Sequence, residues 1–462
     1  MISKIVLQLL EVYKARVYSG SLSDSIDAAS LYSKILFKYQ IPIYNLCDIE
    51  VSLLSRLSAI FEKTEGVLDK DKTKKVLFVV SEAYLVGGHT RLMENLSLML
   101  PDNNDLLITR DCAVAVRSRL SEYFPSIIEC VRHPGENSVG HIIKITENIK
   151  YYDKVILNVH PDDIFSILAC GIVKKLNREV KIFFINHADH VASYGATVAD
   201  FWYEISLYGR VLDNKRGIRG VPSFLGIPIN KSDEMFFKPV NYPSLKKVRN
   251  FVTGASSAKY EPCNRASIFP LLRKILSMDD RFIITVVGPK LFKNYWWWKI
   301  WLQKRRLLIF KSLPYDQYMK ATEDADYYID SYPVPGGTAF VEQFLQGIPC
   351  IGLKTGFYGY TPLEIIKSND TEHVLNLLMH PPSSSELFDL QEKIFNVHSF
   401  SVVKRRFLSS INEGLVSKNP MLDYSETFKS NKEVPHKYVR FICSRDLINV
   451  LIRIIKSWIP NQ

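Results

Sequence analysis

A glycine-rich turn, Gly336-Gly337-Thr338, carries the most specific chemical signal of this sequence. It follows the apolar run 326–330, which has the composition of a strand, and it precedes a segment of helical character. Glycines before a helix let the backbone approach a phosphate closely, and the helix N-terminus attracts negative charge. Thr338 adds a hydroxyl donor, and Glu342, one turn further on, can accept hydrogen bonds from both hydroxyls of a ribose. The segment therefore predicts a nucleoside diphosphate site.

A second strand and turn are expected at 250–259, where an apolar run leads into Ser256, Ser257 and Lys259. The segment resembles the first strand of the nucleotide-binding domain in GT-B glycosyltransferases. The resemblance implies that the hydroxyls and the lysine neutralise the charge of a departing phosphate, a role that can lower a reaction barrier by several kcal/mol. Taken alone, the two serines and the lysine also fit a plain helix cap, and the glycine-rich turn also fits an ordinary helix entry. Together, the two segments favour a diphosphate site.

The glycine-rich segment resembles the donor site of GT-B glycosyltransferases, especially the branch that includes the O-linked N-acetylglucosamine transferases. In that branch a Gly-His-Thr-Thr turn grips the diphosphate, and an acidic residue four positions after its first threonine holds the ribose. Thr338 and Glu342 keep that spacing, whereas Gly337 replaces the histidine and Ala339 the second threonine. The resemblance implies a nucleotide-diphosphate sugar as donor, with UDP favoured, and diphosphate contacts that are fewer or differently supplied.

The resemblance also bears on stereochemistry. Common retaining GT-B enzymes carry two glutamates eight positions apart, and the position eight residues before Glu342 is Val334. The absence of the first glutamate of this pair favours an inverting enzyme, in which a base on the acceptor side takes the proton of the attacking hydroxyl.

One candidate base follows the first predicted strand, 75–80, which leads through a glycine loop into a helix, the opening of a Rossmann-like half. His89 lies at the start of that helix and titrates in the range useful for proton transfer. Gly88 and Arg91 beside it could contact an anionic acceptor or the donor diphosphate. The other interpretation of His89 is a capping or solvent-facing residue.

A competing set follows the predicted strand 180–185, where His187, Asp189 and His190 lie at the carboxyl end. These side chains could form a base with its orienting carboxylate, contact the acceptor or phosphate through His190, or hold a loop by mutual hydrogen bonds. Their adjacency in sequence disfavours a zinc site. Together with Asp200, the segment resembles one found in bacterial cell-surface polysaccharide glycosyltransferases, which implies a role in O-antigen, capsule or lipopolysaccharide biosynthesis.

Alternating strand and helix patterns predict an α/β protein with parallel sheets, and 462 residues, 47% of them hydrophobic, suffice for two domains. With the resemblance, the expected fold is GT-B, two Rossmann-like domains facing across a cleft. We expect a helical N-terminal extension at 1–70 and an N-terminal acceptor domain at 71–240. We expect a C-terminal donor domain at 245–400 and C-terminal helices at 401–462.

The net charge of +11 permits an anionic membrane surface as a partner. The tryptophan-rich basic run 293–306 and a basic amphipathic helix at 445–458 suit a headgroup interface, although both patterns also fit packing against the protein core. Scattered cysteines and the lack of a signal peptide or long apolar run indicate a cytoplasmic protein, peripheral on the inner face of the membrane if those segments bind lipid.

The expected activity is transfer of a hexosyl or N-acetylhexosaminyl group from a nucleotide sugar to a glycan or lipid-linked glycan. The resemblance implies that no metal or other cofactor is needed, since GT-B enzymes generally work without a metal, and Lys259 and the glycine-rich turn would then neutralise the leaving diphosphate. A non-transferring GT-B relative, a sugar-nucleotide hydrolase or epimerase, is the alternative. A basic nucleic-acid-binding module ranks lower, because it leaves both glycine-rich turns unexplained, and no nucleic acid is expected.

Overall fold

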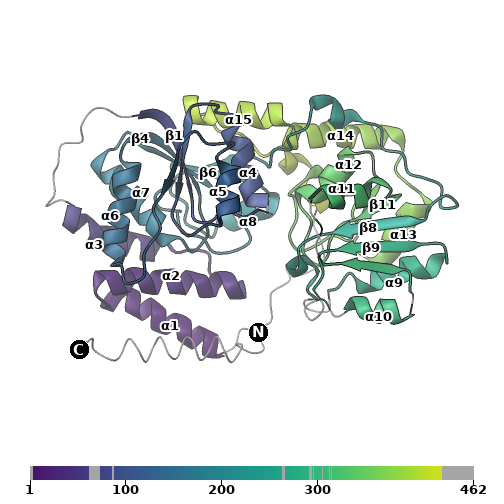
Figure 1. The fold of residues 1–462 in the computed structure, drawn as a ribbon, viewed down its shortest axis with the longest axis horizontal. Helices are drawn as coiled ribbons and strands as arrows, with labels where there is room; N and C mark the ends of the chain where they lie inside the picture. The colour runs from purple at the N-terminus through teal and green to yellow at the C-terminus, as the bar shows by residue number, and fades with distance from the viewer. Residues whose placement is uncertain are drawn as a thin grey trace.

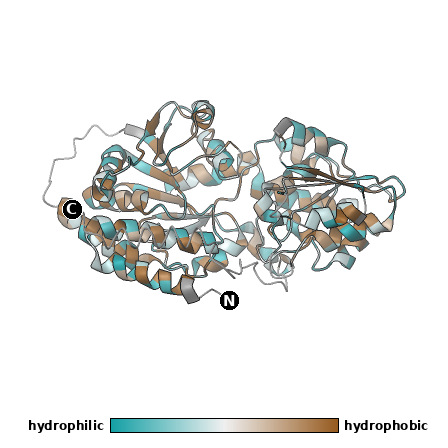
Figure 2. Ribbon diagram, turned by 60° about the horizontal axis from the view of Figure 1, so that its bottom comes forward, coloured by the Kyte–Doolittle hydropathy of each residue, from teal (hydrophilic) through white to brown (hydrophobic). Residues whose placement is uncertain are grey.

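The computed structural model describes residues 4–61, 73–85, 88–262, 266–290, 294, 296–303, 305–311, 313 and 315–428. Two parallel sheets form the centres of two domains that lie side by side (Figure 1). The predicted α/β architecture with two Rossmann-like halves is confirmed. Figure 2 shows the strands of both sheets mainly as hydrophobic, as expected of parallel strands buried on both faces.

The first sheet has seven strands in the order β3-β2-β1-β4-β5-β6-β7. Their bounds are β1 Thr73–Val80, β2 Asn104–Ile108, β3 Ile127–Glu129, β4 Tyr152–Asn158, β5 Lys181–Ile185, β6 Phe201–Glu204 and β7 Val221–Phe224. The helices between them are α4 Gly88–Ser97, α5 Val114–Leu120, α6 Ser138–Ile149, α7 Ile164–Leu176 and α8 Leu207–Asp213. Because β1 pairs with both β2 and β4, the strand order reverses at β1, and ligands of such sheets bind at the carboxyl ends of the strands beside the reversal.

The second sheet has five strands in the order β10-β9-β8-β11-β12. Their bounds are β8 Asn250–Gly254, β9 Ile283–Val287, β10 Leu307–Phe310, β11 Tyr327–Ile329 and β12 Cys350–Ile351. The helices are α9 Phe269–Met278, α10 Trp296–Gln303, α11 Tyr315–Glu323, α12 Thr338–Leu345 and α13 Thr371–Met379. Short 3₁₀ helices lie at η1 Asp233–Phe237, η2 Ser257–Tyr260, η3 Pro362–Ile366 and η4 Pro420–Phe428. Here the order reverses at β8, which pairs with β9 and β11.

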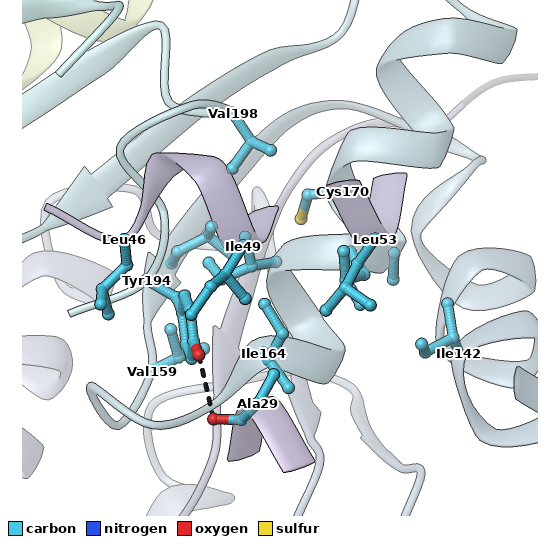
Figure 3. Close-up of a cluster of buried hydrophobic side chains, with 14 of the residues drawn as sticks. Ala29, Leu46, Ile49, Leu53, Ile142, Val159, Ile164, Cys170, Tyr194 and Val198 are labelled. Carbon is cyan, nitrogen blue, oxygen red and sulfur yellow. Dashed lines mark hydrogen bonds between the residues drawn. The ribbon is translucent and has the colours of Figure 1, made fainter. Parts of the chain in front are cut away.

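Three N-terminal helices pack into the same hydrophobic core as the first sheet. They are α1 Lys4–Ser19, α2 Leu22–Tyr39 and α3 Cys47–Phe61. Figure 3 shows Leu53 of α3 and Ile164 of α7 in this core, and the Tyr194 hydroxyl donates to the carbonyl oxygen of Ala29 in α2 at 2.9 Å. The buried Glu50 carboxylate accepts the backbone N–H of Gly195 at 2.8 Å. The helices predicted at 1–70 thus share the core of the first domain.

Two C-terminal helices, α14 Ser384–His398 and α15 Phe400–Glu413, join the domains along one side of the molecule (Figure 1). Leu390 of α14 packs in the core of the second domain, whereas Phe407 of α15 packs against the first sheet. The chain therefore returns to the first domain just after residue 400. The amphipathic helix predicted at 445–458 lies outside the described residues.

Residues 296–303 of the tryptophan-rich run form α10, whose tryptophans divide between core and surface. Trp296 is 2% exposed, whereas Trp298 and Trp301 are 40% and 46% exposed. Trp296 therefore packs in the core, and membrane contact by the exposed tryptophans stays a prediction. In the described part of the chain, no helix has the length and apolar character needed to cross a bilayer.

Candidate active site between the two sheets

A cavity of ≈ 290 Å³ is lined by residues of both domains. The first domain contributes the start of α4, the loop after β5 and Gln40 at the end of α2. The second contributes Lys259, the turn before α12 and the loop after β12. Eight of the predicted site residues meet here: Gly88, His89, His187, His190, Lys259, Gly336, Gly337 and Thr338. Five others do not line the cavity: Arg91, Asp189, Ser256, Ser257 and Glu342.

The turn before α12 is shaped by a buried aspartate and by the absence of side chains. Asp330 Oδ1 accepts the backbone N–H of Gly336 at 2.8 Å, and its Oδ2 lies 2.6 Å from Nζ of the buried Lys367. A Cβ on Gly336 would lie only 2.4 Å from Asp330 Oδ1, so only glycine fits. Gly337 has a φ of +67° and occupies the N-cap position, where it offers no capping side chain. The first-turn N–H groups of α12 thus remain suited to an anionic ligand.

Lys259 supports this turn from the loop after β8. Its Nζ donates to the carbonyl oxygens of Pro335 at 2.8 Å and Gly336 at 3.0 Å. Burial lowers the pKa of Lys259, and the nearby Asp330 carboxylate opposes that shift. An ammonium group has three donors, so one N–H beyond these two bonds can reach a ligand in the cavity. The lysine therefore both holds the turn and brings positive charge to it.

The neighbouring serines have different surroundings. Ser257 is buried, and its hydroxyl donates to Asn294 Oδ1 at 2.5 Å, whereas Ser256 is exposed. Among the described residues, these two therefore hold or border the loop, and Lys259 alone of this turn faces the cavity.

Glu342, predicted to hold a ribose, meets Arg91 across the domain boundary. Arg91 Nη2 lies 2.7 Å from Glu342 Oε1, and Nη1 lies 3.4 Å from Oε2. The Glu342 side chain is only 10% exposed and the Arg91 side chain 43%. The ion pair joins α4 to α12. A carboxylate accepts about four hydrogen bonds, so Glu342 keeps lone pairs for further donors.

His89 and His187 stack with their ring centroids 5.1 Å apart. His89 Nε2 lies 2.9 Å from the carbonyl oxygen of Glu82, and because a carbonyl only accepts, Nε2 must carry the proton. The neutral His89 ring then has its lone pair on Nδ1. Burial and the charge of nearby His160 lower the pKa of His89, so the ring is neutral near pH 7 and able to accept a proton.

His187 is held neutral more strongly. Burial, followed by the charges of His89 and His160, brings the pKa of His187 well below its ordinary value. Its Nδ1 is buried and has no hydrogen-bond partner within the described ranges. Both rings are chemically able to act as a base, and the hydrogen bond from Nε2 sets the tautomer of His89 so that its lone pair lies on Nδ1.

Asp189 orients residues other than these histidines. Its buried carboxylate accepts the hydroxyl of Tyr360 at 2.6 Å and that of Ser206, whose oxygen caps α8. His190 Nδ1 lies 3.7 Å from Asp189 Oδ1, too far for a hydrogen bond. Asp189 thus fixes Tyr360, a residue of the second domain that lines the cavity. Of the predicted roles for Asp189, holding a loop by hydrogen bonds is closest to this arrangement.

Sequence reasoning missed Tyr360, Phe357 and Gln40, which line the cavity, and His160, which lies near its histidines. His160 comes two residues after β4, so the strand-end pattern that identified His187 applies equally to it. Phe357 and Tyr360 follow β12 in an aromatic and glycine-rich run, which is a weaker signal. Gln40 directly follows α2 as its C-cap, and only the packing of that helix brings it here.

The described part of the chain offers no cluster of side chains that could ligate a metal ion. There, no group of three or more His, Cys, Asp or Glu side chains is placed to hold a metal ion. Despite burial, the hydrogen bond with His160 Nδ1 at 2.6 Å and the ion pair with Arg110 Nη2 at 2.5 Å lower the pKa of Asp162 to about 2. Metal independence remains a prediction.

No protein-family model matches this chain, and no curated protein matches its sequence. Solved structures do match its fold. Anabaena HepE in complex with UDP and glucose is 12% identical with a TM-score of 0.55, over 73% of this chain and 100% of that chain. The lipopolysaccharide outer core galactosyltransferase WaaB is 15% identical with a TM-score of 0.53, over 74% and 100%. An O-GlcNAc transferase mutant of Thermobaculum terrenum is 13% identical with a TM-score of 0.51, over 89% and 85%. The chain therefore has the GT-B fold found in glycosyltransferases, as its sequence predicts.

Proposed function

We propose that this protein is a glycosyltransferase that transfers the sugar of a UDP-sugar donor to a glycan acceptor. One observation carries the proposal. A single cavity between the domains combines an anion-binding turn, Gly336-Gly337-Thr338 with Lys259, and a neutral histidine, His89. UDP is favoured as the nucleotide because HepE, which has the same fold, binds UDP and glucose.

The donor would lie against α12. Its diphosphate would accept hydrogen bonds from the first-turn N–H groups and from the remaining N–H of Lys259, while its ribose hydroxyls would bind Glu342. In the reaction, the acceptor oxygen attacks the anomeric carbon as the bond from that carbon to the UDP oxygen breaks. Lys259 and the N-terminus of α12 stabilise the charge that develops on the leaving UDP.

The acceptor hydroxyl must lose its proton as it attacks. Nδ1 of His89 carries the lone pair and can take that proton, which then passes to solvent. Attack from the face opposite UDP inverts the anomeric centre. His187 is the second candidate base, while Asp189 and Tyr360 position the cavity wall.

The acceptor we propose is a growing surface glycan of a bacterium, such as O-antigen, capsule or lipopolysaccharide, with a hexosyl or N-acetylhexosaminyl group transferred. WaaB, a lipopolysaccharide outer core galactosyltransferase of the same fold, supports this assignment. The exposed Trp298 and Trp301 of α10 support a peripheral contact with the inner face of the plasma membrane, where lipid-linked acceptors are accessible.

Calorimetry tests the donor site first. We expect selective binding of one UDP-sugar from a panel of UDP-, GDP-, TDP- and CMP-sugars, and we expect Glu342→Ala to weaken it by at least about tenfold through the lost ribose contact. The absence of binding across the panel would overturn the proposal. Release of free sugar or its epimer, without transfer to any glycan, would indicate the hydrolase or epimerase alternative.

Metal independence is tested separately, in an assay of sugar transfer to a glycan acceptor. We expect EDTA to leave turnover unchanged, because Lys259 and α12 supply the positive charge. Complete loss of turnover that manganese restores would contradict it.

A further inference from the structure

Gln40 brings the N-terminal helices into the wall of the cavity between the domains. It is the C-cap of α2, and its backbone lies in the left-handed region at φ +49° and ψ +47°. Its N–H donates to the carbonyl oxygens of Leu36 and Phe37, and the N–H of Ile41 donates to that of Leu36 at 3.0 Å, the Schellman pattern of a helix end. Glycine is favoured at such a position, because a side chain crowds the left-handed backbone.

A glutamine in this conformation is unusual within the described chain. Only two of its non-glycine residues have a positive φ, Gln40 and Asp102. Asp102 lies in the exposed turn between α4 and β2, and aspartate tolerates the left-handed region through its short polar side chain. Glutamine has no such local advantage. Strained residues of this kind collect at functional sites, and Gln40 is the one of the two that lines the cavity.

The side-chain amide of Gln40 is available to a ligand. The residue is partly buried, and its amide forms no hydrogen bond with any other residue that the structure describes. An amide offers two donors and an oxygen with two lone pairs. The helix that carries it is held firmly, since Leu36 is fully buried and the Ser33 hydroxyl donates to the carbonyl oxygen of Pro161 at 3.3 Å. The amide is therefore free to bind and is presented by a fixed element.

The end of α2 lies on the histidine side of the cavity. Phe37 packs against His160 with ring centroids 4.5 Å apart. The pKa of His89 is lowered by burial and then by the charge of His160, so these two rings are also neighbours. The donor diphosphate is assigned to α12 in the second domain. Gln40 therefore faces the part of the cavity where the acceptor must place its hydroxyl beside His89.

We propose that Gln40 determines acceptor specificity by binding two hydroxyls on neighbouring carbons of the acceptor sugar. A planar amide presents a donor and an acceptor side by side, so Oε1 would accept from one hydroxyl and Nε2 would donate to the next. An N-acetyl group does not fit this pair, because a trans amide points its N–H and C=O in opposite directions. The proposal rests on the transferase function, because it makes this sugar the unit that reacts beside His89.

Ligand-observed NMR with the full-length protein tests the proposal, with and without saturating UDP. The probes are the methyl glycosides of glucose, galactose and mannose, and the 3-deoxy analogue of each, in which no two hydroxyls lie on neighbouring carbons. We expect at least one parent glycoside to bind roughly fivefold more tightly than its analogue, as for the loss of one hydrogen bond. Equal binding of parents and analogues, or binding of no parent, would overturn the proposal.

Two variants locate the effect at the amide. Gln40→Met keeps nearly the same length without the amide, and Gln40→Gly removes the side chain. Both should abolish the preference for the parent glycoside and leave UDP affinity unchanged. Gln40→Gly should also keep or raise the melting temperature, because glycine suits the left-handed backbone. A preference that survives in either variant would overturn the proposal.

Asp102→Gly is the matched control. It also removes a side chain from a left-handed residue, with φ +60°, but at a position that does not line the cavity. This variant should keep the preference, and its loss there would overturn the proposal. UDP titrations separate the two proposals. A wild-type protein that shows the preference without binding UDP would refute the transferase function alone, whereas UDP binding without the preference would refute the role of Gln40 alone.

Discussion

At the scale of single residues, the assignment of the base depends on His89. We expect His89→Gln to lower kcat by at least about a hundredfold, because glutamine keeps the donor to the Glu82 carbonyl but cannot take a proton. UDP affinity should stay unchanged. The matched variant is His187→Gln, in the stacked ring. Steady-state kinetics measure both, and a hundredfold loss in His187→Gln with less than about tenfold in His89→Gln would move the role to His187.

The same residue predicts a pH profile. Burial lowers the pKa of His89 from its ordinary value of 6.5, so the ring is in its base form at higher pH and loses it only as pH falls through the lowered pKa. We expect kcat/KM to stay constant down to about pH 6.5 and to decline below it. The residual activity of His89→Gln should lack this decline at low pH, the acid limb of the profile. A limb centred above pH 7 would contradict a buried neutral histidine as the base.

At the scale of elements, the turn into α12 should tolerate no side chain at Gly336. The added Cβ of Gly336→Ala meets Asp330 Oδ1, so the turn must shift away from the position that aims its N–H groups at the cavity. We expect UDP affinity to fall by at least about tenfold, as for loss of a charge-assisted hydrogen bond. Gly140→Ala in α6 is the control, since its Cβ would meet nothing within 4 Å. Equal UDP affinity in both variants, measured by calorimetry, would contradict this account of the turn.

The junction of α14 and α15 should make the protein sensitive to acid. His398 is buried, its Nδ1 lies 2.8 Å from the Ile227 carbonyl oxygen, and burial lowers the pKa of His398 to about 4. The unfolded chain binds this proton near pH 6.5, so the stabilisation is fully present above that pH and is lost as pH falls toward 4. We expect the difference in unfolding free energy between pH 7.5 and pH 5 to shrink by about 2 kcal/mol in His398→Gln, measured by urea denaturation.

Strand ends are the part of the site that the sequence predicts. Buried apolar runs identify strands, and parallel strands end at one edge of a sheet, so the sequence pattern alone indicates His89, His187, Lys259 and the turn at 336–338. The hydrogen bonds of these residues are not predictable in this way. Whether a serine such as Ser257 faces a ligand or a neighbouring loop depends on tertiary packing, which no local pattern encodes.

At the scale of the whole molecule, the two domains and their GT-B arrangement follow from the alternation of strands and helices and from the resemblance at the donor turn. The N-terminal helices are less predictable. An amphipathic pattern shows that a helix packs, but not on which surface, and so Gln40 at the end of α2 gives no sign in the sequence that it borders the cavity. The pairing of Arg91 with Glu342 likewise depends on how the domains face each other.

That ion pair predicts how the domains behave without a ligand. Arg91 on α4 and Glu342 on α12 join the domains, and the pair is partly shielded from water, so it should favour the closed arrangement by up to about 1 kcal/mol. We expect Arg91→Met to raise the radius of gyration measured by small-angle X-ray scattering without UDP, and a UDP-sugar that binds both domains should restore it. Arg117→Met is the control, because the Arg117–Glu129 ion pair, at 2.8 Å, lies within the first domain. Expansion in both variants, or in neither, would show that this contact does not set the closure, whereas expansion in Arg91→Met alone would identify the Arg91–Glu342 ion pair as a latch between the domains.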